Sequence, residues 1–85
     1  LRLRDDRLLL TYGYRRKPFG NQPRISTDPG KTWSEPITVS GDGANADLGY
    51  HSTVEWQDGT LLTAWYEQMS NHPRSVLRLA RWNLL

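Results

Sequence analysis

The sequence contains no cysteine, only two histidines and no long apolar run. His51 and His72 stand 21 residues apart in a chain of 85, with no second metal ligand spaced around either. Disulfides are therefore excluded, and so are structural zinc and iron–sulfur sites. No stretch approaches the roughly 18 apolar residues of a membrane span, and no signal-peptide pattern is present. We expect no cofactor, no bound metal and no membrane span.

A cysteine-free chain of this length has little core of its own. A domain of this size buries only about 60 to 65% of the surface that its unfolded form exposes. Stability must then come from the packing of the four tryptophans or from strands supplied elsewhere. The chain opens directly on an alternating Leu-Arg-Leu-Arg pattern. We therefore interpret it as part of a larger protein or as one unit of an assembly.

The net charge of +2 conceals three segments of different sign. Residues 1–31 carry eight basic and three acidic side chains, and residues 73–85 carry three basic and no acidic ones. Residues 32–72 between them carry six acidic and no basic side chains. Nucleic-acid modules usually have a one-sided basic excess, so the acidic middle argues against a nucleic-acid partner.

Alternating and β-branched segments bounded by Gly, Pro, Asn or Asp predict an all-β protein. The last of these segments also fits an amphipathic helix, but Pro73 precedes it and no acidic first turn or C-cap glycine frames it, so we predict a strand. The predicted strands are Arg7–Tyr14, Pro23–Ser26, Pro36–Val39, Tyr50–Trp56, Thr60–Glu67 and Ser75–Trp82.

Two stretches 53 residues apart repeat one pattern. Residues 1–12 and 54–65 each read as alternating apolar and polar residues, a two-residue turn, and an apolar strand that ends in an aromatic. Asp58-Gly59 predicts a type I′ hairpin turn, in which both residues need a positive φ, and Asp5-Asp6 is a weaker form of the same turn. A repeat of about 40 to 55 residues with four strands is typical of a β-propeller blade. The chain would then hold about one and two-thirds blades, with a partial blade at 1–49 and a last blade at 50–85 that lacks its outermost strand.

The stretch from Ser26 to Trp33 reads Ser-x-Asp-x-Gly-x-Thr-Trp. Asp28 is placed to accept hydrogen bonds from backbone amides ahead of it, and Gly30 to supply a positive φ. We expect the hydroxyls of Ser26 and Thr32 to brace this turn and the indole of Trp33 to fold back onto the apolar face.

This pattern is the Asp box, and the chain resembles the C-terminal part of the six-bladed β-propeller of the sialidase (neuraminidase) family. The resemblance extends through residues 47–54 and 58–67, so it covers nearly the whole chain. Asp boxes in that family are structural and lie on the blade rim, away from the active site. The resemblance therefore implies that Asp28 is a turn residue.

The resemblance implies an exo-α-sialidase, a glycoside hydrolase that cleaves terminal sialic-acid-type sugars with retention. Such a sugar carries a carboxylate at its anomeric carbon, which would repel an anionic carboxylate nucleophile, and the family uses a tyrosine instead. Tyr50 matches that nucleophile because it lies eight residues before Asp58-Gly59. The family usually reads Tyr-Ser, whereas His51 stands between Tyr50 and Ser52 here. The alternative is that Tyr50 is a half-buried aromatic at the mouth of a strand.

The family also grips the substrate carboxylate with three arginines, whose forked donors match its two oxygens. Arg15 and Arg16 match the arginine of the penultimate blade, and strand alternation would send only one of them inward. We prefer Arg15, with Arg24 as a further candidate; as an alternative, Arg15 and Arg16 belong to a solvated loop tip. Glu67 resembles the glutamate that braces one of the three arginines. The strand here is one residue longer than usual, so a register slip would turn Glu67 to the opposite face, where it is only a polar strand end.

Three classes of function stay open at this point. The first is the sialidase-like hydrolase, whose acid/base residues would lie in blades outside this chain. The second is a non-catalytic glycan-binding or scaffold propeller, in which the same residues line a cavity. The third is an assembly module, in which further copies of the chain complete a ring. The implied partners are a sialic-acid-type glycan or another acidic sugar, and either the remaining blades or further copies. A secreted or periplasmic location is implied by the resemblance alone.

Overall fold

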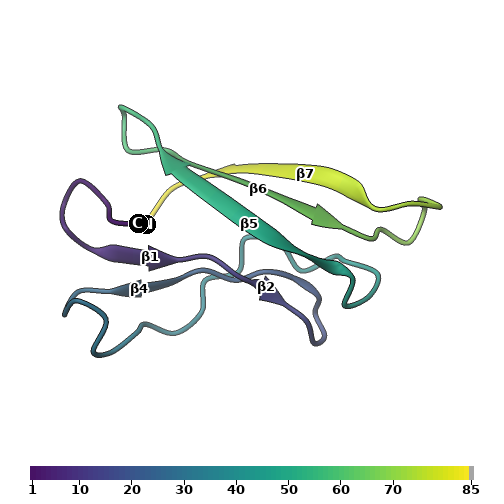
Figure 1. The fold of residues 1–85 in the computed structure, drawn as a ribbon, viewed down its shortest axis with the longest axis horizontal. Coiled ribbons are helices and arrows are strands. Elements are labelled where there is room, and N and C mark those ends of the chain that lie inside the picture. The colour runs from purple at the N-terminus through teal and green to yellow at the C-terminus, as the bar shows by residue number, and fades with distance from the viewer. Residues whose placement is uncertain (85) are drawn as a thin grey trace.

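The computed structural model describes residues 1–84 and confirms that the protein is all-β, with no helix among the residues described. The strands form three small antiparallel sheets, and none of these sheets closes on itself. The sheet β5-β6-β7 lies over the strands of the N-terminal half as a second layer (Figure 1). The strands are β1 (Leu8–Leu10), β2 (Gly13–Tyr14), β3 (Gly20–Asn21), β4 (Arg24–Ser26), β5 (Leu48–Glu55), β6 (Leu61–Glu67) and β7 (Val76–Trp82).

The sheet β5-β6-β7 contains the three longest strands, and they confirm the predictions for this half to within two residues. Strand β6 is central, and its residues alternate between buried and half-buried over its whole length. The buried residues of β6, from Leu61 to Glu67, point toward the N-terminal half, because successive side chains of a strand leave opposite faces. Each pairs with a half-buried residue of β7, so one face of this sheet is turned inward and the other outward.

The N-terminal half forms shorter ladders than the sequence predicts. The expected strand Arg7–Tyr14 is divided into β1 and β2, and β3 was not predicted. Pro36–Val39 is not a strand, although Ile37 N donates to Pro23 O and Val39 N donates to Asn21 O, each close to 3 Å (2.8 and 3.0 Å). Pro23 has no N–H and cannot donate back to Ile37, so the ladder lacks that bond, although Asn21 N donates to Ser40 O at 3.2 Å. Four antiparallel segments nevertheless lie in order: residues 1–3, β1, β4 and residues 34–39.

The two hairpins of the 53-residue repeat have the same backbone hydrogen bonds. In the first hairpin, Leu3 N donates to Arg7 O at 2.8 Å, and Asp6 N donates to Leu3 O at 2.9 Å. The equivalent groups 53 residues later are bonded in the same way, from Trp56 to Thr60 at 2.7 Å and from Gly59 to Trp56 at 3.0 Å. The internal repeat is therefore present in the fold as well as in the sequence.

The predicted type I′ turn at Asp58-Gly59 is wrong. Asp6 and Gly59 have φ of +74° and +87°, but Asp5 and Asp58, which precede them, do not have positive φ. Asp5 and Asp58 instead use a carboxylate oxygen to accept a hydrogen bond from the backbone amide two residues later, at 3.1 and 2.9 Å. This local bond holds the aspartate in an ordinary turn conformation and leaves only the next residue in the left-handed region.

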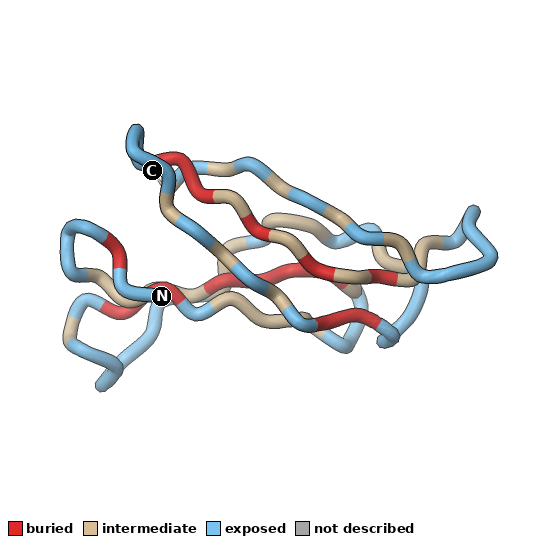
Figure 2. The backbone as a smooth tube through the Cα atoms, turned by 45° about the horizontal axis from the view of Figure 1, so that its top comes forward, coloured by how far each residue is buried: buried red, intermediate tan, exposed pale blue. Residues whose placement is uncertain are grey.

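The core lies between the two layers and is small. Leu3 and Leu9 of the N-terminal half and Leu61 of β6 are at most 3% exposed, and they form one cluster. Burying a leucine side chain is worth about 1.5–3 kcal/mol, so these three residues contribute substantially to holding the layers together. The cluster is extended by the half-buried side chains of Ile25, Trp82 and Leu84. Buried positions alternate along β6 and form a continuous stretch at residues 20–23 of the N-terminal half (Figure 2).

Candidate functional site

Strand β5 contains a bulge at the predicted nucleophile position. Gly49 pairs with Tyr66, and Ser52 pairs with Ala64, so the two residues between them on β5 face the single residue between their partners on β6. Those two residues are Tyr50 and His51, and a bulge of this kind bends a strand and redirects a side chain. His51, which separates Tyr50 from Ser52, is therefore one of the two residues of the bulge.

The bulge makes Tyr50 prominent at the surface. Its φ is +54°, in the left-handed region that bulky residues rarely adopt, and it is 87% exposed. Its ring lies beside that of Tyr66, with centroids 5.6 Å apart and planes tilted by 46°. Such tilted pairs are a favourable aromatic arrangement. The expectation of a half-buried ring is wrong for Tyr50, because the bulge turns the side chain into solvent.

Arg15 lies in the loop after β2, and its guanidinium is placed beside Gly49 and Tyr66. Its Nη2 donates to the carbonyl oxygen of Leu48 at 3.0 Å. A Cβ on Gly49 would stand 3.1 Å from Arg15 Nη2 and 3.6 Å from the ring of Tyr66, so the missing side chain leaves room for both groups. We call Arg15, Tyr50 and Tyr66 the tyrosine–arginine patch. It combines two aromatic rings with one forked cation.

Groups around this patch shift the pKa of the Tyr66 hydroxyl in opposite directions. Loss of solvent raises the pKa of the Tyr66 hydroxyl, and the carboxylate of Asp47 and the neighbouring Tyr50 raise it further, whereas Arg15 acts in the opposite direction. Tyr66 therefore stays a neutral hydrogen-bonding phenol at physiological pH.

Glu67 lies on the opposite face of the sheet from this patch. Its side chain is fully buried, and its Oε1 accepts hydrogen bonds from Trp65 Nε1 at 3.0 Å and from Arg78 Nη1 at 2.8 Å. Arg78 also pairs with Asp42 at 2.6 Å, and its guanidinium lies 5.3 Å from the centre of the Trp65 ring. The loop that contains Asp42 and Gly43 packs closely against Glu67, because a Cβ on Gly43 would stand 2.2 Å from Glu67 Oε2.

His51, the second bulge residue, belongs to the buried side. Its ring stacks on Trp65, with centroids 5.5 Å apart and planes within 8°. Partial burial lowers the pKa of His51, Glu67 opposes this effect, and Arg15 adds to it. Among residues 1–84, His51 Nε2 and Glu67 Oε2 are both buried without a hydrogen-bond partner.

The structure brings together only part of the predicted constellation. Arg15 lies beside Gly49 next to Tyr66, whose ring packs with that of Tyr50, whereas Glu67 lies on the other face of the sheet and pairs with Arg78. Arg16 is exposed and makes no side-chain hydrogen bond within residues 1–84. Arg24 is held in the N-terminal half, where its Nε donates to the Tyr12 hydroxyl at 3.0 Å.

Tyr66 and Arg78 were not predicted from the sequence as site residues. Tyr66 is adjacent to Glu67, and strand alternation alone places it on the other face. Arg78 is the cross-strand partner of Trp65, so the register of β6 against β7 was needed to find it.

The Ser26–Trp33 turn has the hydrogen bonds expected from its sequence. Asp28 accepts from the backbone amide of Thr32 at 2.9 Å, from the Thr32 hydroxyl, and from the Ser26 hydroxyl at 2.7 Å. These bonds, with the Thr32 hydroxyl first, lower the pKa of Asp28 to about 2. Gly30 has the positive φ, +86°. The indole of Trp33 lies over Gly30 and remains 38% exposed, so it folds over the turn rather than into the core.

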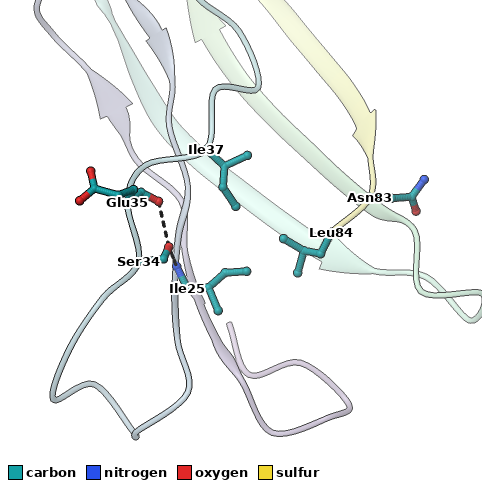
Figure 3. A pocket seen from close by; sticks show the side chains of 6 residues that line it. All are labelled: Ile25, Ser34, Glu35, Ile37, Asn83 and Leu84. Atoms are coloured by element: carbon teal, nitrogen blue, oxygen red, sulfur yellow. Dashed lines mark hydrogen bonds between the residues drawn. The ribbon is translucent and has the colours of Figure 1, made fainter.

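A hollow of about 450 Å³ lies elsewhere, between the N-terminal half and the chain beyond β7. Its walls are mainly the aliphatic side chains of Ile25, Ile37 and Leu84, which point into it (Figure 3). Ser34 is bonded internally, accepting from Ile25 N and donating to Glu35 O. The hollow therefore offers Glu35 as its single ionisable group and lacks a catalytic pair.

Residues 1–84 contain no group of three or more His, Cys, Asp or Glu side chains arranged to hold a metal ion. They contain no helix that is long and apolar enough to cross a membrane.

No family model matches the sequence, and no curated protein matches it. A crystal structure of a protein of unknown function from Dyadobacter fermentans DSM 18053 is similar over 95% of this chain, with a TM-score of 0.81 and 34% sequence identity. This chain spans 22% of the length of that protein. The similarity supports the fold described above and leaves the function to be argued from the residues.

Proposed function

We propose that this chain is the C-terminal part of a sialidase-like six-bladed β-propeller, with the Ser26–Trp33 turn as the observation that carries the proposal. Every hydrogen bond that the Asp box pattern predicts around Asp28 is made. Two further features support the assignment. The hairpin recurs at 53 residues, and four antiparallel segments lie in order in the N-terminal half, as a four-stranded blade requires.

The proposed reaction is retaining cleavage of a terminal sialic-acid-type sugar. A base from another blade takes the phenol proton of Tyr50, the Tyr50 oxygen attacks the anomeric carbon as the bond to the leaving group breaks, and an acid from another blade protonates the leaving oxygen. Water then displaces Tyr50 from the sugar: one proton of that water passes to the acid/base group, and the Tyr50 oxygen takes its proton back from the base. The 87% exposure of Tyr50 supports this role, because its hydroxyl is accessible to a bulky sugar.

Arg15 is the proposed clamp for the substrate carboxylate. Only Nη2 of its guanidinium is engaged with the protein, at Leu48 O, and the side chain lies beside the Tyr50–Tyr66 pair. Arg16, which has no such anchor, becomes the lesser candidate. Glu67, which the resemblance assigns as a brace for one of the arginines, holds Arg78 and Trp65 on the inner face of the sheet rather than Arg15.

The test is turnover of a fluorogenic sialoside by a complete propeller that contains this chain. Tyr50→Phe should abolish turnover, because the ring remains and the nucleophilic oxygen is lost. Tyr66→Phe is the matched control on the same patch and should retain turnover. Arg15→Ala should raise KM more than it lowers kcat, since binding of the carboxylate is weakened. Undiminished turnover by Tyr50→Phe would remove Tyr50 from the mechanism.

A non-catalytic glycan-binding propeller is the second candidate, favoured by the separation of Tyr50 from Glu67 across the sheet. In that case the Tyr50 and Tyr66 rings would stack on a sugar and Arg15 would bind its carboxylate, without chemistry. Saturation-transfer NMR with a sialoside distinguishes the two. Binding that Arg15→Ala abolishes, with no turnover in the complete propeller, supports the binding function.

A further inference from the structure

His51 is a half-buried residue that the proposed reaction does not use. It is the second residue of the bulge and directly follows Tyr50. Its ring lies on the inner face of the sheet, stacked on that of Trp65 with centroids 5.5 Å apart. Its Nε2 is buried and has no hydrogen-bond partner within residues 1–84. The packing of the ring, and not a hydrogen bond of Nε2, therefore holds His51 in place.

The groups around the His51 ring are themselves fixed. A Cβ on Gly13 of β2 would stand 3.1 Å from His51 Cε1, so the N-terminal half approaches the ring closely. Trp65, on which the ring stacks, is 2% exposed. Its Nε1 donates to Glu67 Oε1 at 3.0 Å, and the guanidinium of Arg78 lies 5.3 Å from its ring centre. Offset stacking on so constrained an indole leaves the imidazole little freedom to move.

Tyr50 has the opposite surroundings. It is 87% exposed, and its φ of +54° is costly for a bulky residue. Such a backbone conformation persists only where the surrounding structure enforces it. An exposed side chain supplies little of that constraint, although the ring packs with that of Tyr66. Of the two neighbours in the chain, Gly49 has no side chain, so His51 supplies the anchor in the interior.

We propose that His51 is a positioning residue that holds Tyr50 in its outward conformation. The two residues are adjacent in the bulge, and their side chains leave opposite faces of the sheet. Fixing the His51 ring on the inner face therefore fixes the direction of Tyr50 on the outer face. Glu67, which does not hold Arg15, then acts on Tyr50 through the stacked rings of Trp65 and His51. This role rests on the proposed function, because it takes Tyr50 as the nucleophile.

The first readout is kcat and KM for a fluorogenic sialoside, measured with the complete propeller that contains this chain. His51→Ala removes the anchored ring and should lower kcat on the order of 10- to 100-fold, because misplacing a reacting group by about 1 Å has an effect of that size. KM should stay close to the wild-type value, since Arg15 is held by Leu48 O. His51→Phe keeps a flat ring on Trp65 and should recover most of kcat. His72→Ala alters an exposed histidine and should behave like the wild type.

The second readout reports the surroundings of residue 50 without turnover. Fluorotyrosine incorporated in place of Tyr50 alone gives one fluorine NMR signal, which senses the ring of Tyr66 beside it. His51→Ala should move this signal toward that of free fluorotyrosine, and His51→Phe should leave it near its wild-type position. Far-UV circular dichroism checks that each variant is folded. His51→Leu, which fills similar space without a flat ring, replaces His51→Ala if that variant is not.

The two readouts separate the failure of this role from the failure of the proposed function. Absence of turnover in the wild-type propeller counts against the proposed function alone, and the fluorine signal still tests whether His51 positions Tyr50. A folded His51→Ala that keeps either kcat or the fluorine signal of the wild type would overturn the proposal. So would a His51→Phe variant as impaired as His51→Ala, because that result would assign the effect to the imidazole nitrogens rather than to ring packing.

Discussion

The two halves of this protein share a hairpin but build very different amounts of sheet from it. Strands β5, β6 and β7 contain eight, seven and seven residues, whereas β1 to β4 contain two or three each. Four of the five prolines lie in the first 36 residues, and the fifth, Pro73, lies in a loop. The comparison teaches that the turn is specified locally, whereas the length of a ladder depends on which backbone donors face each other across it.

The halves also differ in which residues occupy equivalent positions of the repeat, half-buried in the first half and buried in the second. Glu67 and Trp65 correspond to Tyr14 and Tyr12, so a buried carboxylate in the second half replaces a phenol in the first. Breaking the Glu67–Arg78 pair should produce the largest effect of any single change. Arg78→Met leaves the fully buried Glu67 carboxylate unpaired, and we expect a loss of about 3–5 kcal/mol in the free energy of unfolding, measured with urea.

Asp42 supplies the matched control for this prediction, because it pairs with the same arginine from a side chain that is 62% exposed. Asp42→Asn should cost at most about 1 kcal/mol. The double variant Glu67→Leu with Arg78→Met removes both charges and should recover much of the loss. Equal costs for Arg78→Met and Asp42→Asn would contradict a special role for the buried partner.

The second prediction compares Leu9 with its repeat equivalent, Leu62. Leu9→Ala should lower the free energy of unfolding by about 2–5 kcal/mol, because it opens a cavity in the leucine cluster between the two layers. Leu62→Ala removes the same atoms from an open face and should cost the dilute monomer about 1 kcal/mol. Urea denaturation measures both. If the two substitutions cost the same at low concentration, the outer face is not open in solution.

The third prediction concerns the residue with positive φ in each hairpin. No atom lies within 4 Å of the place where a Cβ would stand on Gly59, so Gly59→Ala introduces conformational strain without a clash. We expect a cost of about 1–2 kcal/mol. Gly59→Asp should cost less, because aspartate tolerates this conformation and Asp6 adopts it at the equivalent position. Thermal unfolding gives the ranking, and a larger cost for Gly59→Asp than for Gly59→Ala would break the equivalence of the turns.

The repeat, the three long strands and the hydrogen bonds of the Ser26–Trp33 turn were predictable, because each depends on residues close together in the sequence. The bulge at Tyr50 and His51 was not. An extra residue between Tyr50 and Ser52 is compatible with either a bulge or a slipped register, and only pairing with β6 decides between them.

Features that depend on neighbours far along the chain were missed for a similar reason. The ladder beside residues 34–39 is incomplete because Pro23, which has no amide proton, lies opposite Ile37 and cannot return its hydrogen bond. Arg78 joins Glu67 only through the register of β7. Periodicity gives the face of a residue within its own strand, and it contains no information about which side chain the next strand places opposite.

The smallest effect is expected at Asp28, whose turn has no counterpart in the second half. Folding lowers the pKa of Asp28 from 3.8 to about 2, chiefly through the Thr32 hydroxyl and amide. A carboxylate whose pKa is lowered stabilises the folded chain above its unfolded pKa, and that contribution disappears as the pH falls from about 4 through about 2. Asp28→Asn should therefore be less stable than the wild type at neutral pH, and the difference should shrink over this acid range. Thr32→Val removes the largest cause of the shift, so it should weaken the same pH dependence. A difference between wild type and Asp28→Asn that stays constant down to pH 2 would show that the turn does not depend on the charge of Asp28.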